Sequence, residues 1–165
     1  MKIRFLALII FSIAFAYVES SVVFYLRKLS GNEFIHPVSD YRELLDLGAI
    51  AFIYSKDTIL GDIKYQTVEI YREFMTLIML VCVSYLSGKV FRERFGAFLV
   101  AFSLWDIFYY IFLKLMTGWP KTIFDMDIYF LIPVAWVGPV ITPLFVSAVL
   151  FLVGLKLYFP KAHFP

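Results

Sequence analysis

Three charged residues, Glu69, Arg72 and Glu73, stand at the beginning of an apolar run that is long enough to cross a membrane. Spacings of three and four residues place side chains on one side of a helix, so the two carboxylates lie one turn apart. A charge at the centre of a bilayer costs at least about 2.5–3.5 kcal/mol, and charged residues inside spans therefore pair or mark functional sites. Acidic groups in this position indicate chemistry in which a carboxylate binds a cation or takes up a proton.

Two other apolar runs also contain ionisable residues. Glu19 lies beside a stripe of small residues at four-residue spacing, Ser12, Ala16 and Ser20. Such stripes allow helices to approach closely, which predicts that Glu19 faces other helices. Asp106 and Tyr110 lie one turn apart in a later run, and Lys114 lies two turns beyond Asp106. In a bundle we expect these residues to converge at one level.

Acidic residues outnumber basic residues at this level. The acidic side chains are Glu19, Glu69, Glu73 and Asp106, and the basic ones are Arg72 and Lys114. An unpaired carboxylate in an apolar environment binds a cation or becomes protonated. The sequence therefore predicts that these six residues and Tyr110 form a buried polar site in the outer half of the bundle, which binds a cation or relays protons.

The residue types in this site limit the cofactors that it could hold. The site contains no His or Cys, so a bound metal would be one that accepts oxygen ligands, such as Mg²⁺, Ca²⁺, Mn²⁺ or iron. Its ligands would be Glu19, Glu69, Glu73 and Asp106, and Tyr110 would contact these ligands without binding the metal itself. The histidines, His36 and His163, lie outside the apolar runs, so no haem is expected.

An inert network of polar contacts is the alternative to a functional site. Arg72 would then bridge Glu19 and Glu73, and Lys114 would pair with Asp106. Polar groups of this kind hold membrane helices together. The same residues would in that case have a purely structural role.

The composition of the chain indicates a membrane protein. Of 165 residues, 62% are hydrophobic and only 17% are charged, and the mean hydropathy is +0.84. Soluble domains have about 45–50% apolar and about 25% charged residues. The net charge of +2 and the lack of a basic cluster exclude a nucleic-acid partner. The single cysteine, Cys82, excludes an internal disulfide.

Four apolar stretches define the expected elements. A crossing needs about 20 residues, and the ranges 3–26, 66–86 and 95–117 each fit one crossing. The fourth stretch, 128–159, would make a helix of about 48 Å and is interrupted by Pro133, Pro139 and Pro143. We therefore expect 143–159 to be the crossing, and 128–142 to be a broken or re-entrant segment or a short interfacial helix.

The predicted fold is a single all-α membrane domain over residues 1–165, a four-transmembrane-helix bundle capped by its first loop. This loop, 30–65, is too long for a plain connector. Asp40 followed by Glu43 predicts a helix that runs to about Leu47 and ends at Gly48. The apolar run 49–54 predicts a strand, or an apolar patch lying on the membrane surface at the outer end of the bundle.

The distribution of basic residues predicts the orientation of the chain. The short turn 89–94 is dense in Lys and Arg, which favours a cytoplasmic position for this turn and for both termini. Lys2 and Arg4 before an apolar run that meets the small residues 14–16 are also typical of a cleaved signal peptide. Because the apolar run continues to Leu26, we expect a retained span in the bacterial inner membrane.

Several motifs in fixed order resemble an uncharacterised family of small bacterial multi-pass integral membrane proteins. These motifs are Glu19 with Arg27, Arg72–Glu73, Trp105–Tyr110, Gly118–Pro120 and Phe130–Val140. The family has a proline at the position of Ala135. No activity is attached to the family, so the resemblance implies a multi-pass membrane protein and no residue roles.

Three classes of function fit these observations. The first is the cation-binding or proton-relaying site, for which a homodimer or larger membrane complex is expected because the chain is short for a transporter. The second is an intramembrane enzyme acting on a lipid- or quinone-like substrate, with Glu73 or Asp106 as general acid or base and Arg72 and Lys114 holding an anionic head group. The third is a non-catalytic accessory or assembly subunit. The partner common to all three is the lipid bilayer.

Overall fold

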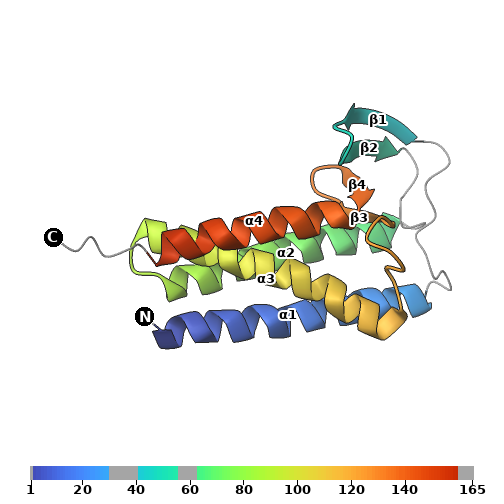
Figure 1. The fold of residues 1–165 in the computed structure, drawn as a ribbon. Helices are drawn as coiled ribbons and strands as arrows, with labels where there is room; N and C mark the ends of the chain where they lie inside the picture. The colour runs from blue at the N-terminus through green and yellow to red at the C-terminus, as the bar shows by residue number, and fades with distance from the viewer. Residues whose placement is uncertain (1, 30–40, 56–62, 160–165) are drawn as a thin grey trace.

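The computed structural model describes residues 2–29, 41–55 and 63–159. This part of the chain forms four helices and four strands, in the order α1 (Lys2–Leu29), β1 (Tyr41–Asp46), β2 (Ala51–Ser55), α2 (Ile63–Ser87), α3 (Phe91–Thr117), β3 (Met126–Phe130), β4 (Ala135–Pro139) and α4 (Ile141–Tyr158). The helices lie side by side, and the strands gather at the end where α1 finishes and α2 begins (Figure 1). The start of α1 and the end of α4 lie at the opposite end.

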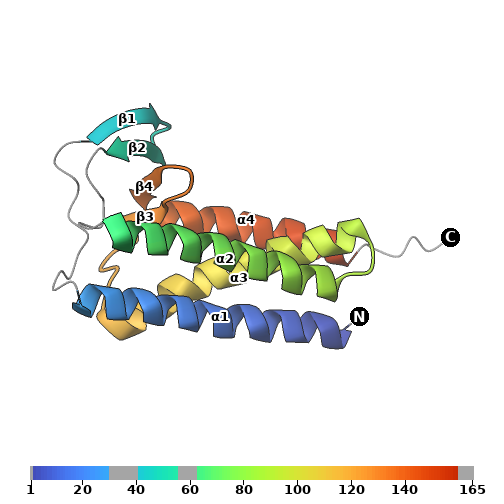
Figure 2. The same cartoon turned by 180° about the vertical axis from the view of Figure 1, so that it is seen from behind.

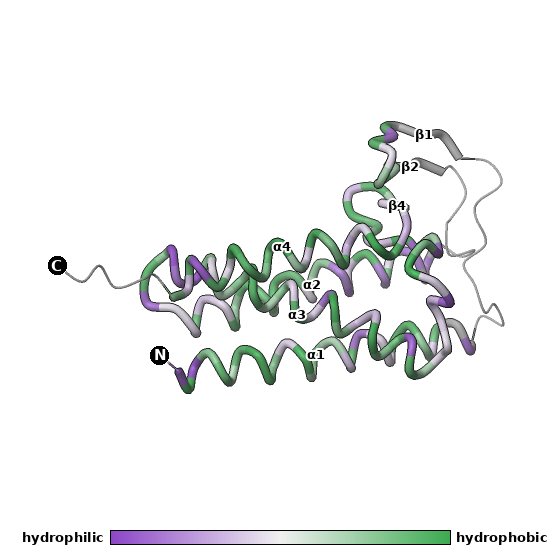
Figure 3. Tube along the Cα trace, viewed as in Figure 1, coloured by the Kyte–Doolittle hydropathy of each residue, from purple (hydrophilic) through white to green (hydrophobic). Residues whose placement is uncertain are grey.

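All four helices are long and apolar enough to cross a membrane. The candidate spans are Lys2–Leu26, Gln66–Ser87, Phe91–Thr117 and Ile141–Tyr158, in agreement with the number predicted from the sequence. Hydrophobic residues dominate the length of the bundle, and many hydrophilic residues gather toward its ends (Figure 3). The fold therefore has the polarity expected of a chain that spans a bilayer.

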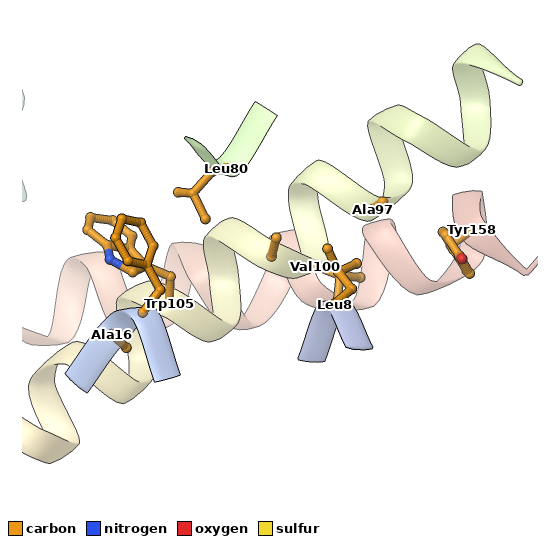
Figure 4. Packing of buried hydrophobic residues seen from close by; sticks show 9 residues of the cluster. Leu8, Ala16, Leu80, Ala97, Val100, Trp105 and Tyr158 are labelled. Carbon is orange, nitrogen blue, oxygen red and sulfur yellow. The ribbon is translucent and has the colours of Figure 1, made fainter. Parts of the chain in front are cut away.

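Helix α3 occupies the centre of the bundle. It contacts α1, α2 and α4, and seen from behind α2 passes in front of it (Figure 2). The core is formed by small and aliphatic side chains from all four helices, including Leu8, Ala16, Leu80 and Val100, together with Tyr158 (Figure 4). The other three helices bury few of their apolar side chains and leave the rest half-buried or exposed.

Two glycines allow α3 and α4 to pack backbone against backbone. A Cβ atom added to Gly96 would lie 2.7 Å from the backbone nitrogen of Tyr158 and 2.9 Å from the carbonyl oxygen of Gly154. A Cβ atom on Gly154 would lie 2.9 Å from the carbonyl oxygen of Gly96. Small residues at such contacts let membrane helices gain van der Waals packing that larger side chains would prevent.

The four strands form one antiparallel sheet in the order β1-β2-β4-β3. Phe52 of β2 and Phe130 of β3 both pair with Trp136, on the two sides of β4. Strand β1 lies at the edge farthest from the helices (Figure 1). Because β3 follows α3 and β4 precedes α4, the β3–β4 hairpin connects the two helices that pack most closely.

The first loop differs from its prediction in one respect. The helix expected from Asp40 to Leu47 is wrong, because residues 41–46 form strand β1 and pair with β2; Asp40 itself lies outside the described residues. The helix-start signal is local, whereas β1 is held by cross-strand hydrogen bonds to the apolar strand β2, which a local pattern does not contain. The strand interpretation of 49–54 is confirmed, with β2 at Ala51–Ser55.

A helical form of 128–142 is also wrong, and the fold is mostly helical with a small antiparallel sheet and not all-α. This segment is neither a broken helix nor an interfacial helix but largely the β3–β4 hairpin. The hairpin pairs its own backbone groups, which membrane proteins require of any non-helical segment near the bilayer. Pro133 lies between the strands, Pro139 ends β4, and Pro143 lies in the first turn of α4, where helix N–H groups have no partner in the helix. Helix α4, the fourth candidate span, begins at Ile141, two residues earlier than expected.

Candidate functional site in two groups of buried polar residues

The first group joins α1 to α2 and is called here the Arg72 network, formed by Glu19, Glu69, Arg72 and Thr76. The Nη2 of Arg72 lies 2.7 Å from Oε2 of Glu69, and its Nη1 pairs with Oε2 of Glu19. The hydroxyl of Thr76 donates to the other oxygen of Glu19 at 2.9 Å. Both carboxylates are buried, so one guanidinium holds two acidic groups of different helices.

The identity of the second partner of Arg72 corrects the network predicted from the sequence. Arg72 bridges Glu19 and Glu69, and not Glu19 and Glu73. Adjacent residues of a helix point in different directions, whereas residues three apart face the same side. The carboxylate of Glu73 instead accepts a hydrogen bond of 2.9 Å from the backbone N–H of Leu131, which directly follows β3. Glu73 therefore attaches α2 to the β3–β4 hairpin.

The second group lies between α3, α4 and β3 and is called here the Asp106 cluster, formed by Asp106, Tyr110, Asp127 and Ser147. The hydroxyl of Ser147 donates to Oδ2 of Asp106 at 2.8 Å, and the hydroxyl of Tyr110 donates to Oδ2 of Asp127 at 2.8 Å. All four side chains are buried. Asp106 and Asp127 lie close enough for their charges to interact.

Lys114 does not belong to either group. Its Nζ donates to the carbonyl oxygens of Pro120 and Lys121, the latter at 3.3 Å. The predicted pair with Asp106 is therefore wrong. Two helical turns separate the two residues by about 12 Å along the axis, and the carbonyl groups of the loop that follows α3 are nearer partners for the ammonium group.

The seven predicted residues are thus divided between separate partners. Glu19, Glu69 and Arg72 come together, Asp106 and Tyr110 belong to one cluster, and Glu73 and Lys114 bind backbone groups. In the part of the chain that the structure describes, no three His, Cys, Asp or Glu side chains are arranged to hold a metal ion. The four-carboxylate metal site therefore gains no support from this geometry.

Three site residues were not selected from the sequence. Thr76 and Ser147 are hydroxyl residues within apolar helices. Such residues often donate a hydrogen bond to the backbone of their own helix, as Ser12 and Ser103 do. Asp127 lies close to Asp125 in the chain, and only the position of β3 distinguishes the buried carboxylate from its neighbour. Strand alternation would place residues two apart on the same face, so it could not have separated the two carboxylates; Asp125 precedes β3, and Asp127 lies within it.

Two ionisable groups near the cluster lie outside the candidate spans, and their surroundings shift their pKa values. Burial raises the pKa of Tyr129 to about 12, and its hydroxyl donates to the carbonyl oxygen of Pro139 at 2.7 Å. The hydroxyl of Thr122, which donates to Asp125 at 2.7 Å, lowers the pKa of that carboxyl. Tyr129 therefore remains a neutral donor, and Asp125 remains an anion, over the pH range in which proteins normally work.

Fold and sites together define a mostly helical protein with four candidate membrane spans, a small antiparallel sheet at one end and two buried polar groups. No family model, curated protein or solved structure matches the chain. The resemblance to a family of small bacterial membrane proteins therefore stays a prediction, and function has to be argued from the residues themselves.

Proposed function

We propose that this protein is a multi-pass membrane protein whose Asp106 cluster takes up and relays protons. The observation that supports the proposal is the environment of Asp106. This side chain is 9% exposed, and the group that hydrogen-bonds to it is the neutral hydroxyl of Ser147. Neither ion pair of Arg72 includes Asp106.

The hydrogen-bond partners of the two carboxyl groups suit proton exchange. A serine or tyrosine hydroxyl can donate to a carboxylate and can also accept from a carboxylic acid. Asp106 and Asp127 can therefore gain or lose a proton while each keeps its hydrogen bond. Because the two carboxyl groups belong to one buried cluster, we infer that protonation of one affects the other.

The order of the residues along the structure gives the relay a direction. Asp106 lies near the middle of α3, and Tyr110 lies one turn nearer the end of that helix. Asp127 lies in β3 and accepts from Tyr110. The cluster thus extends from within a candidate span toward the sheet, where Asp125 precedes β3 at the surface. We infer that protons enter or leave at this end.

The orientation of the relay follows from the basic residues of the opposite end. The turn between α2 and α3 contains Lys89, and Arg92 and Arg94 follow it in the first turn of α3. Basic residues concentrate on the cytoplasmic side of membrane proteins. We propose that this turn and both termini face the cytoplasm of a bacterial cell, so that the sheet and the outer end of the Asp106 cluster face outside.

Infrared difference spectroscopy of the protein in lipid nanodiscs tests proton uptake directly. A protonated carboxylic acid has a C=O stretching band that a carboxylate lacks. Between the alkaline and acid ends of a pH titration, we expect a band from a buried acid that Asp106→Asn removes and that Asp127→Asn shifts, since the pair is coupled. Asp125→Asn is the matched control, because the same chemical change at a partly exposed carboxyl should leave that band in place.

The result that would overturn the proposal is equally specific. If the Asp106→Asn variant folds and its difference spectrum equals that of the parent protein, no proton is exchanged at Asp106. An intact fold is checked by the helical circular dichroism signal. A spectrum that changes equally in the Asp125→Asn control would also contradict the assignment.

A further inference from the structure

Two tryptophan indole groups are buried without a hydrogen-bond acceptor. The Nε1 atoms of Trp105 and Trp136 are closed off from solvent and have no partner, and these are the two such side-chain atoms in the described residues. Buried indole N–H groups usually find an acceptor, and a buried polar atom without one calls for an explanation such as an unseen ligand. Trp105 belongs to the central helix, and Trp136 belongs to β4.

The two indoles pack against the same aromatic ring. The ring centroid of Phe130 is 6.4 Å from that of Trp105 and 6.0 Å from that of Trp136. Phe102 stacks on Phe130 at 6.4 Å with an interplanar angle of 19°, and Phe52 packs against Trp136 at 5.0 Å. The surroundings of the two donors are therefore aromatic and suit a planar ring.

The position of Phe130 is tied to that of the hairpin. It is the last residue of β3, and the N–H of the next residue, Leu131, is held by the carboxylate of Glu73. A shift of this end of the hairpin away from α2 would move the Phe130 ring and uncover the two donors that pack against it.

We propose that this aromatic site binds an uncharged, membrane-soluble carbonyl compound, whose carbonyl oxygen atoms accept hydrogen bonds from Trp105 and Trp136. The compound is uncharged because none of the residues whose rings form the site carries a charge. It contains carbonyl groups because both unsatisfied protein atoms are donors. A quinone ring, with two carbonyl oxygen atoms and a planar face, satisfies both requirements, and the ester carbonyl of a phospholipid is a second source of the same chemistry.

The indole N–H resonances of the protein provide the test, because the chain contains only 3 tryptophans. Each resonance is assigned by a single substitution, Trp105→Phe, Trp119→Phe or Trp136→Phe. The isotope-labelled protein is placed in dodecyl maltoside micelles, which contain no carbonyl group, and titrated with decylubiquinone. We expect the Trp105 and Trp136 resonances to shift toward hydrogen-bonded values, and the Trp119 resonance to stay in place.

A second arm distinguishes the two sources of carbonyl groups. The labelled protein is transferred from micelles to phosphatidylcholine nanodiscs without quinone. If the Trp105 and Trp136 resonances shift on this transfer and do not shift further with decylubiquinone, the ligand is the ester carbonyl of the lipid. If both resonances already have hydrogen-bonded values in micelles, or if neither additive moves them, the proposal is overturned.

Affinity measurements separate a specific site from partition into the micelle. Loss of one ordinary hydrogen bond should weaken binding of the carbonyl compound by about fivefold to tenfold in Trp105→Phe and in Trp136→Phe. Trp119→Phe, which removes the same indole group at a distant position, should bind like the parent protein. Equal affinity in all three variants would contradict the proposal. This inference does not depend on the proton relay, which the carboxyl variants test separately.

Discussion

The hydroxyl of Tyr110 donates a hydrogen bond of 2.8 Å to Oδ2 of Asp127. This contact joins the central helix α3 to the first strand of the hairpin, and both side chains are buried. Together with the contact of Glu73 to the N–H of Leu131, it fixes the hairpin against two helices. The sheet is thus attached to the bundle by polar groups as well as by the packing of Phe130.

Removal of the Tyr110 hydroxyl should destabilise the protein. Tyr110→Phe keeps the ring but takes the donor from a buried aspartate, and leaving a buried polar group unsatisfied costs about 1–3 kcal/mol. The measurement is thermal unfolding in detergent. Tyr71→Phe is the control, because Tyr71 is 63% exposed on α2 and its hydroxyl should be dispensable. Equal unfolding temperatures for the two variants would show that the hydrogen bond contributes nothing.

Substitution of Arg72 should have a larger effect than substitution of Tyr110. Arg72→Ala leaves Glu19 and Glu69 buried without their cation, and breaking a buried pair from one side costs about 3–5 kcal/mol. Arg72→Lys should recover only part of this loss, because an ammonium group cannot reproduce the planar fork that reaches both carboxylates. Thermal unfolding of the two variants gives the comparison, and full recovery by lysine would contradict the two-partner geometry.

The helices could be predicted from the sequence because a span must satisfy every backbone group within itself. Length and hydropathy therefore determine the four crossings to within a few residues. The stripe of small residues on α1 correctly indicated that Glu19 faces the interior, where it is 4% exposed. Which acidic residue of α2 shares a face with Arg72 was harder to predict, because Arg72 has acidic neighbours both three residues before it and directly after it.

The sheet could not be predicted in the same way, because its hydrogen bonds join segments that are far apart in the chain. Strand β2 pairs with β4 across more than eighty residues, and no local pattern contains that pairing. The prolines of 128–142 indicated only that the segment is not a continuous helix. Asp127 and Trp136 belong to the hairpin and Trp105 packs against its Phe130, so these residues were missed with it. The role of Ser147 depends on how α4 packs against α3.

Substitution of Gly96 or Gly154 by alanine should separate α3 from α4. The added Cβ atoms would meet backbone atoms at 2.7–2.9 Å, and overpacking of this kind typically costs about 1–3 kcal/mol. Val149→Ala on the outer face of α4 is the control, since Val149 is 45% exposed. Because Ser147 reaches Asp106 across the same helix pair, the glycine variants should also alter the infrared band of Asp106. Stability equal to that of the control would contradict the close packing.

The turn before β3 should respond to acid through Asp125. Its carboxylate accepts from the Thr122 hydroxyl at 2.7 Å and from the N–H of Lys121 at 2.7 Å, and these donors lower its pKa below the ordinary value of 3.8. A carboxyl whose pKa is lower in the folded state contributes stability above its ordinary pKa and loses it as the pH falls through the folded value. Thr122→Ala removes the donor with the largest effect, so the pKa of Asp125 should rise toward 3.8. Carboxyl NMR titration of the parent and variant proteins measures this change, and identical titration curves would show that the Thr122 hydroxyl does not hold the anion.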